Sequence, residues 1–198
     1  MNHRLLIAQG LVLMMGCFAA VDTMAEDQNL LLDDFSTRDG VSSFGTQWVG
    51  FTDRVMGGRS DLNVSYIDTD VGPAVQMTGR VRLENNGGFI QIRLPLQDRT
   101  GPADISGYTA IRLEVQGQPG AYYLHLRTRD NRRPWHYYSA PVPVTDQWQT
   151  LDIPINDFQA QGTRAALDLS QAESIAVVAY GEAFDADIQV RRIELIAP

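Results

Sequence analysis

Short segments in which apolar and polar residues alternate run through most of the chain, and this pattern most constrains the fold. In residues 110–117, AIRLEVQG, the residues Ile111, Leu113 and Val115 alternate with polar ones. A period of two places the apolar side chains on one face of a strand. Gly, Pro, Asn or Asp separates nearly all of the segments, and a sustained helical period is lacking. The sequence therefore predicts an all-β sandwich of two sheets.

The same pattern predicts the individual elements. Residues 174–181, SIAVVAYG, are apolar on both faces, so we expect a central strand there. Residues 168–174 favour a short helical turn capped by Asp168 or Ser170. In all, about nine strands are predicted, over residues 30–35, 74–84, 88–96, 110–117, 122–129, 135–144, 149–155, 174–181 and 188–196.

The first residues are typical of a targeting segment rather than of a folded domain. A basic tip, MNHR, precedes an apolar run that is short for a membrane span. Small residues at Thr23 and Ala25 suit cleavage after Ala25, so residues 1–25 are predicted to be a signal peptide of an exported, periplasmic protein. An alternative is a lipoprotein signal that makes Cys17 the acylated residue, which would anchor the protein to a membrane. Residues 26–198 are long enough for one domain.

Composition excludes several classes of function. The chain has 24 Asp and Glu against 16 basic residues, a net charge of −8, so nucleic acid is not expected as a partner. All of the basic residues are arginines, and the absence of lysine excludes a P-loop and a Schiff base. The only cysteine is Cys17, so we expect neither disulfides nor thiolate metal ligands in the domain. No cofactor or metal is predicted.

Residues 48–60, WVGFTDRVMGGRS, form a loop with an unusual composition. Its apolar side chains, Val55 and Met56 among them, are interrupted by Asp53 and Arg54. Apolar residues of this size favour burial, so we expect another segment to cover the loop. One interpretation is structural, with the two charged groups satisfying backbone groups while the glycines allow close approach. The other is a binding loop.

Residues 80–94, RVRLENNGGFIQIRL, have the form of a β-hairpin. Alternating residues lead into and out of an Asn-Gly turn, which is favoured where backbone φ must be positive. A two-residue turn needs only one such pair, and the extra Asn85 and Gly88 would suit a ligand or a neighbouring loop. A plain turn and a binding loop both remain open.

Two motifs in this order resemble the complex I intermediate-associated protein 30 family. The first, D-x-V-M-G-G-x-S, begins at Asp53 and ends at Ser60; the second, N-N-G-G-F, spans residues 85–89 and has Arg93 four residues on. The resemblance implies a galactose-binding-like jelly roll. It also implies a role in assembly, since mitochondrial members hold intermediates of respiratory NADH:ubiquinone oxidoreductase. We expect the two Gly-Gly stretches to meet at one end of the sandwich, where they cover Trp48 and Phe89.

The sequence contains no recognisable catalytic motif. Neither a nucleophile elbow nor a zinc-binding HExxH helix is present. His125 shares a strand face with Tyr123 and Arg127, and His136 shares one with Tyr138, so these residues are predicted to line one polar, aromatic surface. We therefore expect a binding protein and not an enzyme.

Two functions remain at this point. The first is an exported module that binds a protein partner during assembly of an envelope complex. The second is a carbohydrate-binding module, because Tyr123, Trp135, Tyr137 and Tyr138 could stack on sugars while Arg127 and Arg129 donate hydrogen bonds. The candidate binding residues are Trp48, Asp53, Arg54, Met56, Gly57, Gly58, Ser60, Asn85, Asn86, Gly87, Gly88, Phe89, Arg93, Tyr123, Arg127 and Trp135.

Overall fold

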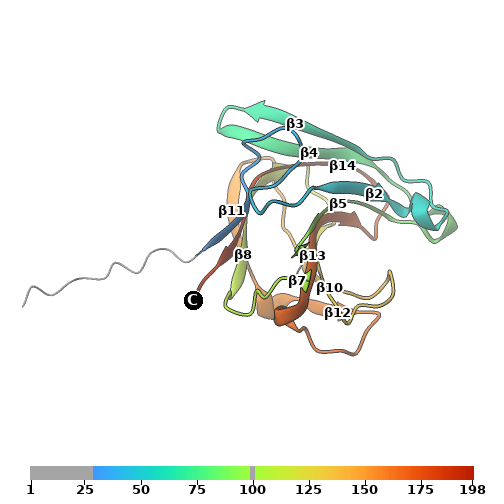
Figure 1. Ribbon diagram of the computed structural model, residues 1–198. Helices are drawn as coiled ribbons and strands as arrows, with labels where there is room; N and C mark the ends of the chain where they lie inside the picture. Colours follow the sequence, from blue (N-terminus) through green and yellow to red (C-terminus); the bar gives the residue numbers. More distant parts are fainter. Residues whose placement is uncertain (1–28, 99–100) are drawn as a thin grey trace, which may run out of the picture.

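Two antiparallel sheets face each other, as the alternating pattern predicts (Figure 1). The computed structural model describes residues 29–98 and 101–198; the predicted signal peptide and Cys17 lie outside them. Sheet 1 has the order β11-β8-β14-β4-β3, with β1 also paired to β14. Its strands are β1 (Leu30–Asp33), β3 (Asn63–Thr69), β4 (Gly72–Val81), β8 (Ala110–Gly117), β11 (Gln149–Pro154) and β14 (Phe184–Ile196).

Sheet 2 has the order β12-β10-β9-β13-β5-β2. Its strands are β2 (Val49–Thr52), β5 (Phe89–Pro95), β9 (Tyr122–Thr128), β10 (Tyr137–Pro141), β12 (Gln159–Gln161) and β13 (Ala172–Tyr180). Two further strands, β6 (Gln97–Asp98) and β7 (Gly101–Pro102), pair with each other. Single 3-10 turns connect the strands: η1 (Asp53–Met56), η2 (Glu84–Asn86), η3 (Ile155–Asp157) and η4 (Leu169–Gln171). Within the described ranges, no helix is long and apolar enough to cross a membrane.

The core lies between the inner faces of the two sheets. In β8, the inward side chains of Ile111, Leu113 and Val115 are fully buried. The outward Arg112 instead donates to Asp152 of the neighbouring strand β11, at 2.6 Å from Nε to Oδ1. This separation of apolar from charged side chains follows directly from the period of two.

The strand pattern predicted most elements correctly. All nine predicted strands are present, and β13 lies between β9 and β5, which confirms the central strand. The side chain of Asp168 caps η4 by accepting from the Ser170 amide, as expected for the short turn. The pattern missed the two-residue strands β6 and β7, and among the longer strands it missed β2, β3 and β12. These are edge strands, which need less apolar character because one side remains unpaired.

The predicted hairpin over residues 80–94 is wrong. Its two strands belong to different sheets, since β4 pairs in sheet 1 and β5 pairs in sheet 2. The segment between them crosses the end of the sandwich through η2, where Asn85 and Asn86 adopt left-handed φ values of 59° and 58°. Asparagine tolerates this conformation, so the residues that signalled a hairpin turn build a crossover instead.

Candidate functional site

Asp53 joins the two Gly-Gly segments at one end of the sandwich. It begins η1 directly after β2, and its side chain is fully buried. The carboxylate accepts hydrogen bonds from the Ser60 amide at 3.0 Å, from the Ser60 hydroxyl at 2.5 Å and from the Gly88 amide at 2.6 Å. We call residues 53–60 and 84–89 together the clasp. The expectation that the two Gly-Gly stretches meet is confirmed (Figure 1, where η1 and η2 lie together at one end).

The glycines of the clasp leave room for this carboxylate. A Cβ atom on Gly58 would lie 2.3 Å from Asp53 Cγ, and one on Gly87 would lie 2.4 Å from Asp53 Oδ2. Asn85 adds a cross-link, because its Nδ2 donates to the Gly57 carbonyl at 3.0 Å. Both loops therefore need glycine for close packing around one buried acid, which is the structural interpretation of the motif.

Hydrogen bonding keeps this buried acid ionised. Burial alone would raise the pKa of the Asp53 carboxyl, but the hydrogen bonds from Ser60, Gly88 and Phe89 outweigh burial and hold the pKa below its ordinary value. Asp53 is thus a negative charge at the centre of the clasp, surrounded by hydrogen-bond donors of the protein itself. Because the Asp53 side chain is fully buried and hydrogen-bonded within the protein, we assign it a structural role.

The apolar part of the clasp is not covered, contrary to the sequence expectation. Val55 is 71% exposed and Met56 is 53% exposed at the tip of η1. Hydrogen bonds to Asp53 and to the Gly57 carbonyl hold η1 in the clasp, while the Val55 and Met56 side chains lie exposed. They do so at the edge of a groove.

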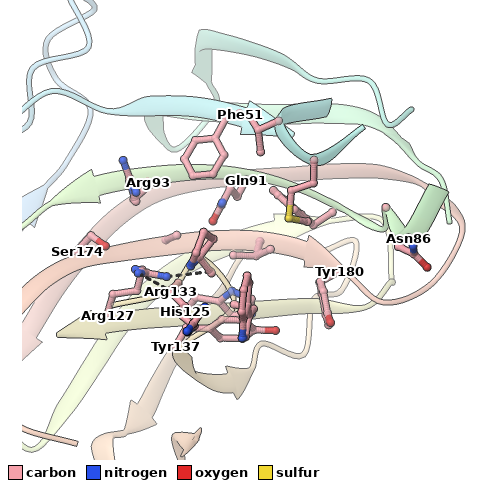
Figure 2. Close-up of a pocket in the computed structure, with 18 of the residues that line it drawn as sticks. Phe51, Asn86, Gln91, Arg93, His125, Arg127, Arg133, Tyr137, Ser174 and Tyr180 are labelled. Carbon is pink, nitrogen blue, oxygen red and sulfur yellow. Dashed lines mark hydrogen bonds between the residues drawn. The ribbon is translucent and has the colours of Figure 1, made fainter. Parts of the chain in front are cut away.

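The groove has a volume of about 450 Å³ and lies on the outer face of sheet 2 (Figure 2). Its floor is β13, whose outward side chains Ser174, Ala176 and Val178 are small. The strand register places Ala176 between Arg93 on β5 and His125 on β9. Small residues on the central strand between larger neighbours produce the hollow.

One wall of the groove consists of β2, β5 and η1. Phe51 and Phe89 contact each other edge to face, with ring centroids 6.3 Å apart. Gln91 lies beside them on β5, and Val55 and Met56 of η1 extend the wall outwards. The clasp positions η1 at the edge of the groove, because Asp53 of η1 bonds to the start of β5.

The opposite wall consists of β9, β10, the end of β13 and the loop 131–136. His125 stacks on Tyr137, with ring centroids 4.1 Å apart, and both contact Tyr180. Trp135 on the loop is 55% exposed and Tyr180 is 40% exposed. Figure 2 shows His125 and Tyr137 on the opposite side of the groove from Phe51. Aromatic rings thus face the groove from both walls.

Arg127 fixes the loop 131–136 against sheet 2. Its Nη1 donates to the carbonyls of Pro134 at 2.9 Å and His136 at 2.8 Å. Its Nη2 donates to the carbonyls of Asn131 at 2.6 Å and Arg133 at 3.2 Å. A planar guanidinium can satisfy several acceptors at once in this way. Arg127 is therefore a positioning residue for the loop.

Two other arginines of the groove lie over aromatic rings. The Cζ atom of Arg93 is 5.0 Å from the centroid of Phe51, and that of Arg133 is 5.4 Å from the centroid of Trp135. Such cation–π contacts hold a guanidinium in place without using its N–H groups. Each wall therefore presents a cation next to an aromatic ring.

His125 is the histidine of the groove, and it is uncharged at neutral pH. Burial, together with the positive charge of Arg127, lowers the pKa of its imidazole from 6.5 to about 3. The ring is 9% exposed and stacks on Tyr137. A group with this pKa is a poor general base or acid near pH 7.

The buried His125 should make stability depend on pH. In the window between the unfolded pKa of 6.5 and the folded value of about 3, the unfolded chain takes up a proton that the folded protein excludes. Between pH 6.5 and pH 4.5 the free energy of unfolding should therefore fall by about 2 kcal/mol more than in His125→Gln. Urea unfolding at both pH values measures this difference. His136→Gln is the matched control, and equal pH dependence with and without His125 would contradict the prediction.

The structure separates the candidate binding residues into four groups. Trp48 lies in the core, where its Nε1 donates to Asp33. The clasp contains Asp53, Arg54, Gly57, Gly58, Ser60, Asn85 and Gly88. Tyr123 shares the outer face of β9 with His125 and contacts Tyr180. The groove itself is lined by Met56, Asn86, Gly87, Phe89, Arg93, Arg127 and Trp135.

The predicted aromatic surface on β10 needs a correction. Tyr138 faces the core, where its hydroxyl donates to the Ala166 carbonyl at 2.9 Å, and it is Tyr137 that faces the groove. The register pairs Ser139 with His125, so odd-numbered residues of β10 lie outwards. A one-residue difference in register reverses the faces of a strand, and His136 precedes β10.

Other groove residues were missed by sequence reasoning. Gln91 could have been found, because it shares a strand face with Phe89 and Arg93. Tyr180 and the groove-floor residues of β13 gave no sequence signal for a binding site, because a strand that is apolar on both faces is typical of the core. The adjacent Arg132 and Arg133 were an unrecognised cationic pair beside Trp135. Within the described part of the chain, no group of three or more His, Cys, Asp or Glu residues could hold a metal ion.

A family model described as Complex I intermediate-associated protein 30 matches residues 18–185. The chain belongs to this family. The clasp explains the family-like motifs, because Asp53, Gly58, Ser60, Gly87 and Gly88 all contribute to one hydrogen-bonded centre. None of the curated proteins compared with the chain matched it in sequence.

Solved structures with the same fold include carbohydrate-binding modules of Clostridium thermocellum. The family 11 module of cellulosomal cellulase Lic26A-Cel5E has a TM-score of 0.68 at 16% identity, covering 86% of this chain and 95% of that one. The family 11 module in complex with a β-1,3-1,4-mixed-linked tetrasaccharide has a TM-score of 0.66 at 16% identity, covering 85% and 95%. The family 30 module of cellulase Cel9D-Cel44B has a TM-score of 0.60 at 14% identity, covering 85% and 97%. These similarities establish the jelly-roll fold.

Proposed function

We propose that this protein is a non-catalytic module that binds a carbohydrate chain in the groove of sheet 2. The observation that carries the proposal is the open groove with aromatic rings on both walls, Trp135 and Tyr180 being the most exposed of them. Sugar rings have apolar faces that pack on aromatic side chains, and their hydroxyls bond to neighbouring polar groups. Gln91 and Asn86 supply such groups here.

The size and surroundings of the groove support this proposal. A volume of about 450 Å³ is within the range of small-ligand sites. A family 11 module of the same fold was solved with a bound tetrasaccharide. His125, with its low pKa, offers no effective acid–base group at neutral pH.

Replacing Trp135 with alanine tests the proposal. The change removes the most exposed aromatic ring of the groove, so we expect affinity for a retained polysaccharide to fall at least tenfold, by about 1.4 kcal/mol or more. Affinity gel electrophoresis against a panel of neutral and acidic polysaccharides measures retention, and thermal unfolding checks the fold. Trp148→Ala is the matched control, because Trp148 lies beside Glu114 and Arg191 of sheet 1. Equal retention of both variants would refute the proposal.

A second candidate is a protein-binding module that assists assembly of an envelope complex. The exposed Val55 and Met56, together with Leu83 at 50% exposure, favour it, because apolar side chains fixed in an exposed position are common in protein interfaces. Membership of the family supports the same role. Crosslinking of the tagged chain in the periplasm, followed by mass spectrometry, separates the two candidates. Recovery of a defined membrane complex, lost on Met56→Asp, would favour the second, whereas recovery of glycan alone would refute it.

A further inference from the structure

The groove is cationic although the protein as a whole is acidic. The chain carries a net charge of −8. The side chains that line the groove nevertheless include four arginines and no aspartate or glutamate: Arg93, Arg127, Arg132 and Arg133. His125 adds no charge at neutral pH. A neutral sugar chain would not require this separation of charge, whereas an anionic ligand would benefit from it.

Three of these arginines have guanidinium groups that remain available. Within residues 29–98 and 101–198, the side chains of Arg93, Arg132 and Arg133 make no hydrogen bond or ion pair. Six arginines elsewhere on the surface pair with acids, as Arg112 does with Asp152 and Arg38 with Asp68. The groove arginines instead contact aromatic rings or solvent. The Nε of Arg93 is buried without a hydrogen-bond partner, so the groups that can donate to a ligand are the terminal Nη groups of Arg93 and the exposed guanidinium groups of Arg132 and Arg133.

The positive charges also lie close to one another. Burial lowers the pKa of the Arg127 guanidinium; Glu173 opposes this effect and the charge of Arg93 adds to it. Glu173 is not one of the lining residues. Like charges held near each other by the sheet register repel, and an anion bound between them would relieve the repulsion.

We propose that the ligand of the groove is an acidic polysaccharide, whose anionic oxygens bond to Arg93 and Arg133 while its sugar rings stack on Phe51 and Trp135. Carboxylate and sulfate oxygens both suit a guanidinium, which donates two parallel hydrogen bonds to either. The cation–π contacts place each guanidinium over one face of its ring, so an anionic group bound to the guanidinium would lie next to a sugar that stacks on the other face. This inference rests on the proposed carbohydrate function and names the class of carbohydrate.

Two matched pairs of probes test the charge directly. Polygalacturonate and its fully methyl-esterified form share a backbone and differ in carboxylate charge, whereas dextran sulfate and dextran differ in sulfate. We expect at least tenfold tighter binding of one charged member than of its neutral partner, and at least tenfold weakening of that binding between 50 and 500 mM NaCl, because salt screens exposed charges. The charged probe that binds identifies carboxylate or sulfate as the preferred group.

Variants show whether the groove is responsible. Arg133→Gln should lower affinity for the preferred charged probe about tenfold, and Arg93→Gln with Arg133→Gln about a hundredfold, because each removes charge-assisted hydrogen bonds. Arg80→Gln is the matched control: Arg80 is an exposed arginine on β4, outside the groove, near Asp185. Thermal unfolding verifies that each variant folds.

The possible failures are distinguishable. Equal or tighter binding of the neutral partners would overturn the charge inference and leave the carbohydrate function standing. Absence of binding to every polysaccharide would overturn both. Equal affinity for poly-L-glutamate would assign the groove to an acidic polypeptide and overturn the inference as well. Unchanged affinity in the double arginine variant would show that the charged probe binds elsewhere.

Discussion

Replacement of Asp53 with alanine is expected to lower the free energy of unfolding by about 4 kcal/mol. The carboxylate is fully buried and accepts hydrogen bonds from both the amide and the hydroxyl of Ser60 and from the amide of Gly88. Removing it leaves these donors buried without an acceptor, and each such group costs about 1–3 kcal/mol. Urea unfolding followed by tryptophan fluorescence measures the loss.

A neighbouring acid provides the control for Asp53. Asp61 belongs to the same region of the chain, but it is exposed and pairs with Arg54 at the surface. Exposed ion pairs contribute about 0–1 kcal/mol, so Asp61→Ala should be nearly neutral. If Asp53→Ala lost no more stability than Asp61→Ala, the clasp would not be what stabilises this end of the sandwich.

Replacement of Arg127 with glutamine is expected to lower both stability and ligand affinity. The guanidinium donates to four carbonyls of the loop 131–136, and hydrogen bonds from charged groups contribute about 1.5–3 kcal/mol each. Because water can replace part of these bonds on a partly exposed loop, we expect a net loss of about 2–4 kcal/mol. Polysaccharide affinity should fall as far as in Trp135→Ala, because Trp135 depends on the loop for its position.

A readout of the loop itself distinguishes this role from general destabilisation. Tryptic cleavage between Arg132 and Arg133 should accelerate in Arg127→Gln under conditions in which the rest of the domain stays folded. Arg127→Lys should restore the loop only in part, because an ammonium group cannot bond to four carbonyls in a plane. Arg129→Gln, an exposed arginine two residues away, is the control. Unchanged cleavage and affinity in Arg127→Gln would contradict the positioning role.

The sequence was most informative where a local pattern decided the structure. The residues of β8 alternate strictly, and both its bounds and its buried face were predicted without the structure. Close backbone approach in the clasp could also be predicted, because one Gly-Gly stretch follows Asp53 and the other follows an Asn pair. In β8 the relevant forces act within one strand, whereas the two loops of the clasp are joined by hydrogen bonds between residues distant in sequence.

The path of the chain after the Asn-Gly segment could not be predicted from a local pattern. A turn signal shows that the chain can change direction, but it does not say which sheet the next strand joins. Here the Asp53 carboxylate accepts from the amides of Gly88 and Phe89 at the start of β5. This long-range contact holds the start of β5 beside η1 and belongs to no local pattern.

By itself, the sequence determined the all-β class, most of the strands and the presence of two glycine-rich loops, because strand period and glycine conformation are local properties. Only the tertiary structure decided that the proposed binding surface is a groove. Its floor, its aromatic walls and its arginines come from strands that are distant in sequence and adjacent in sheet 2. Ser174, Ala176 and Val178 read as core, and they form a hollow only because larger side chains stand on both neighbouring strands. The register between strands distant in sequence, which packing of the whole sandwich sets, brings these residues together in one groove.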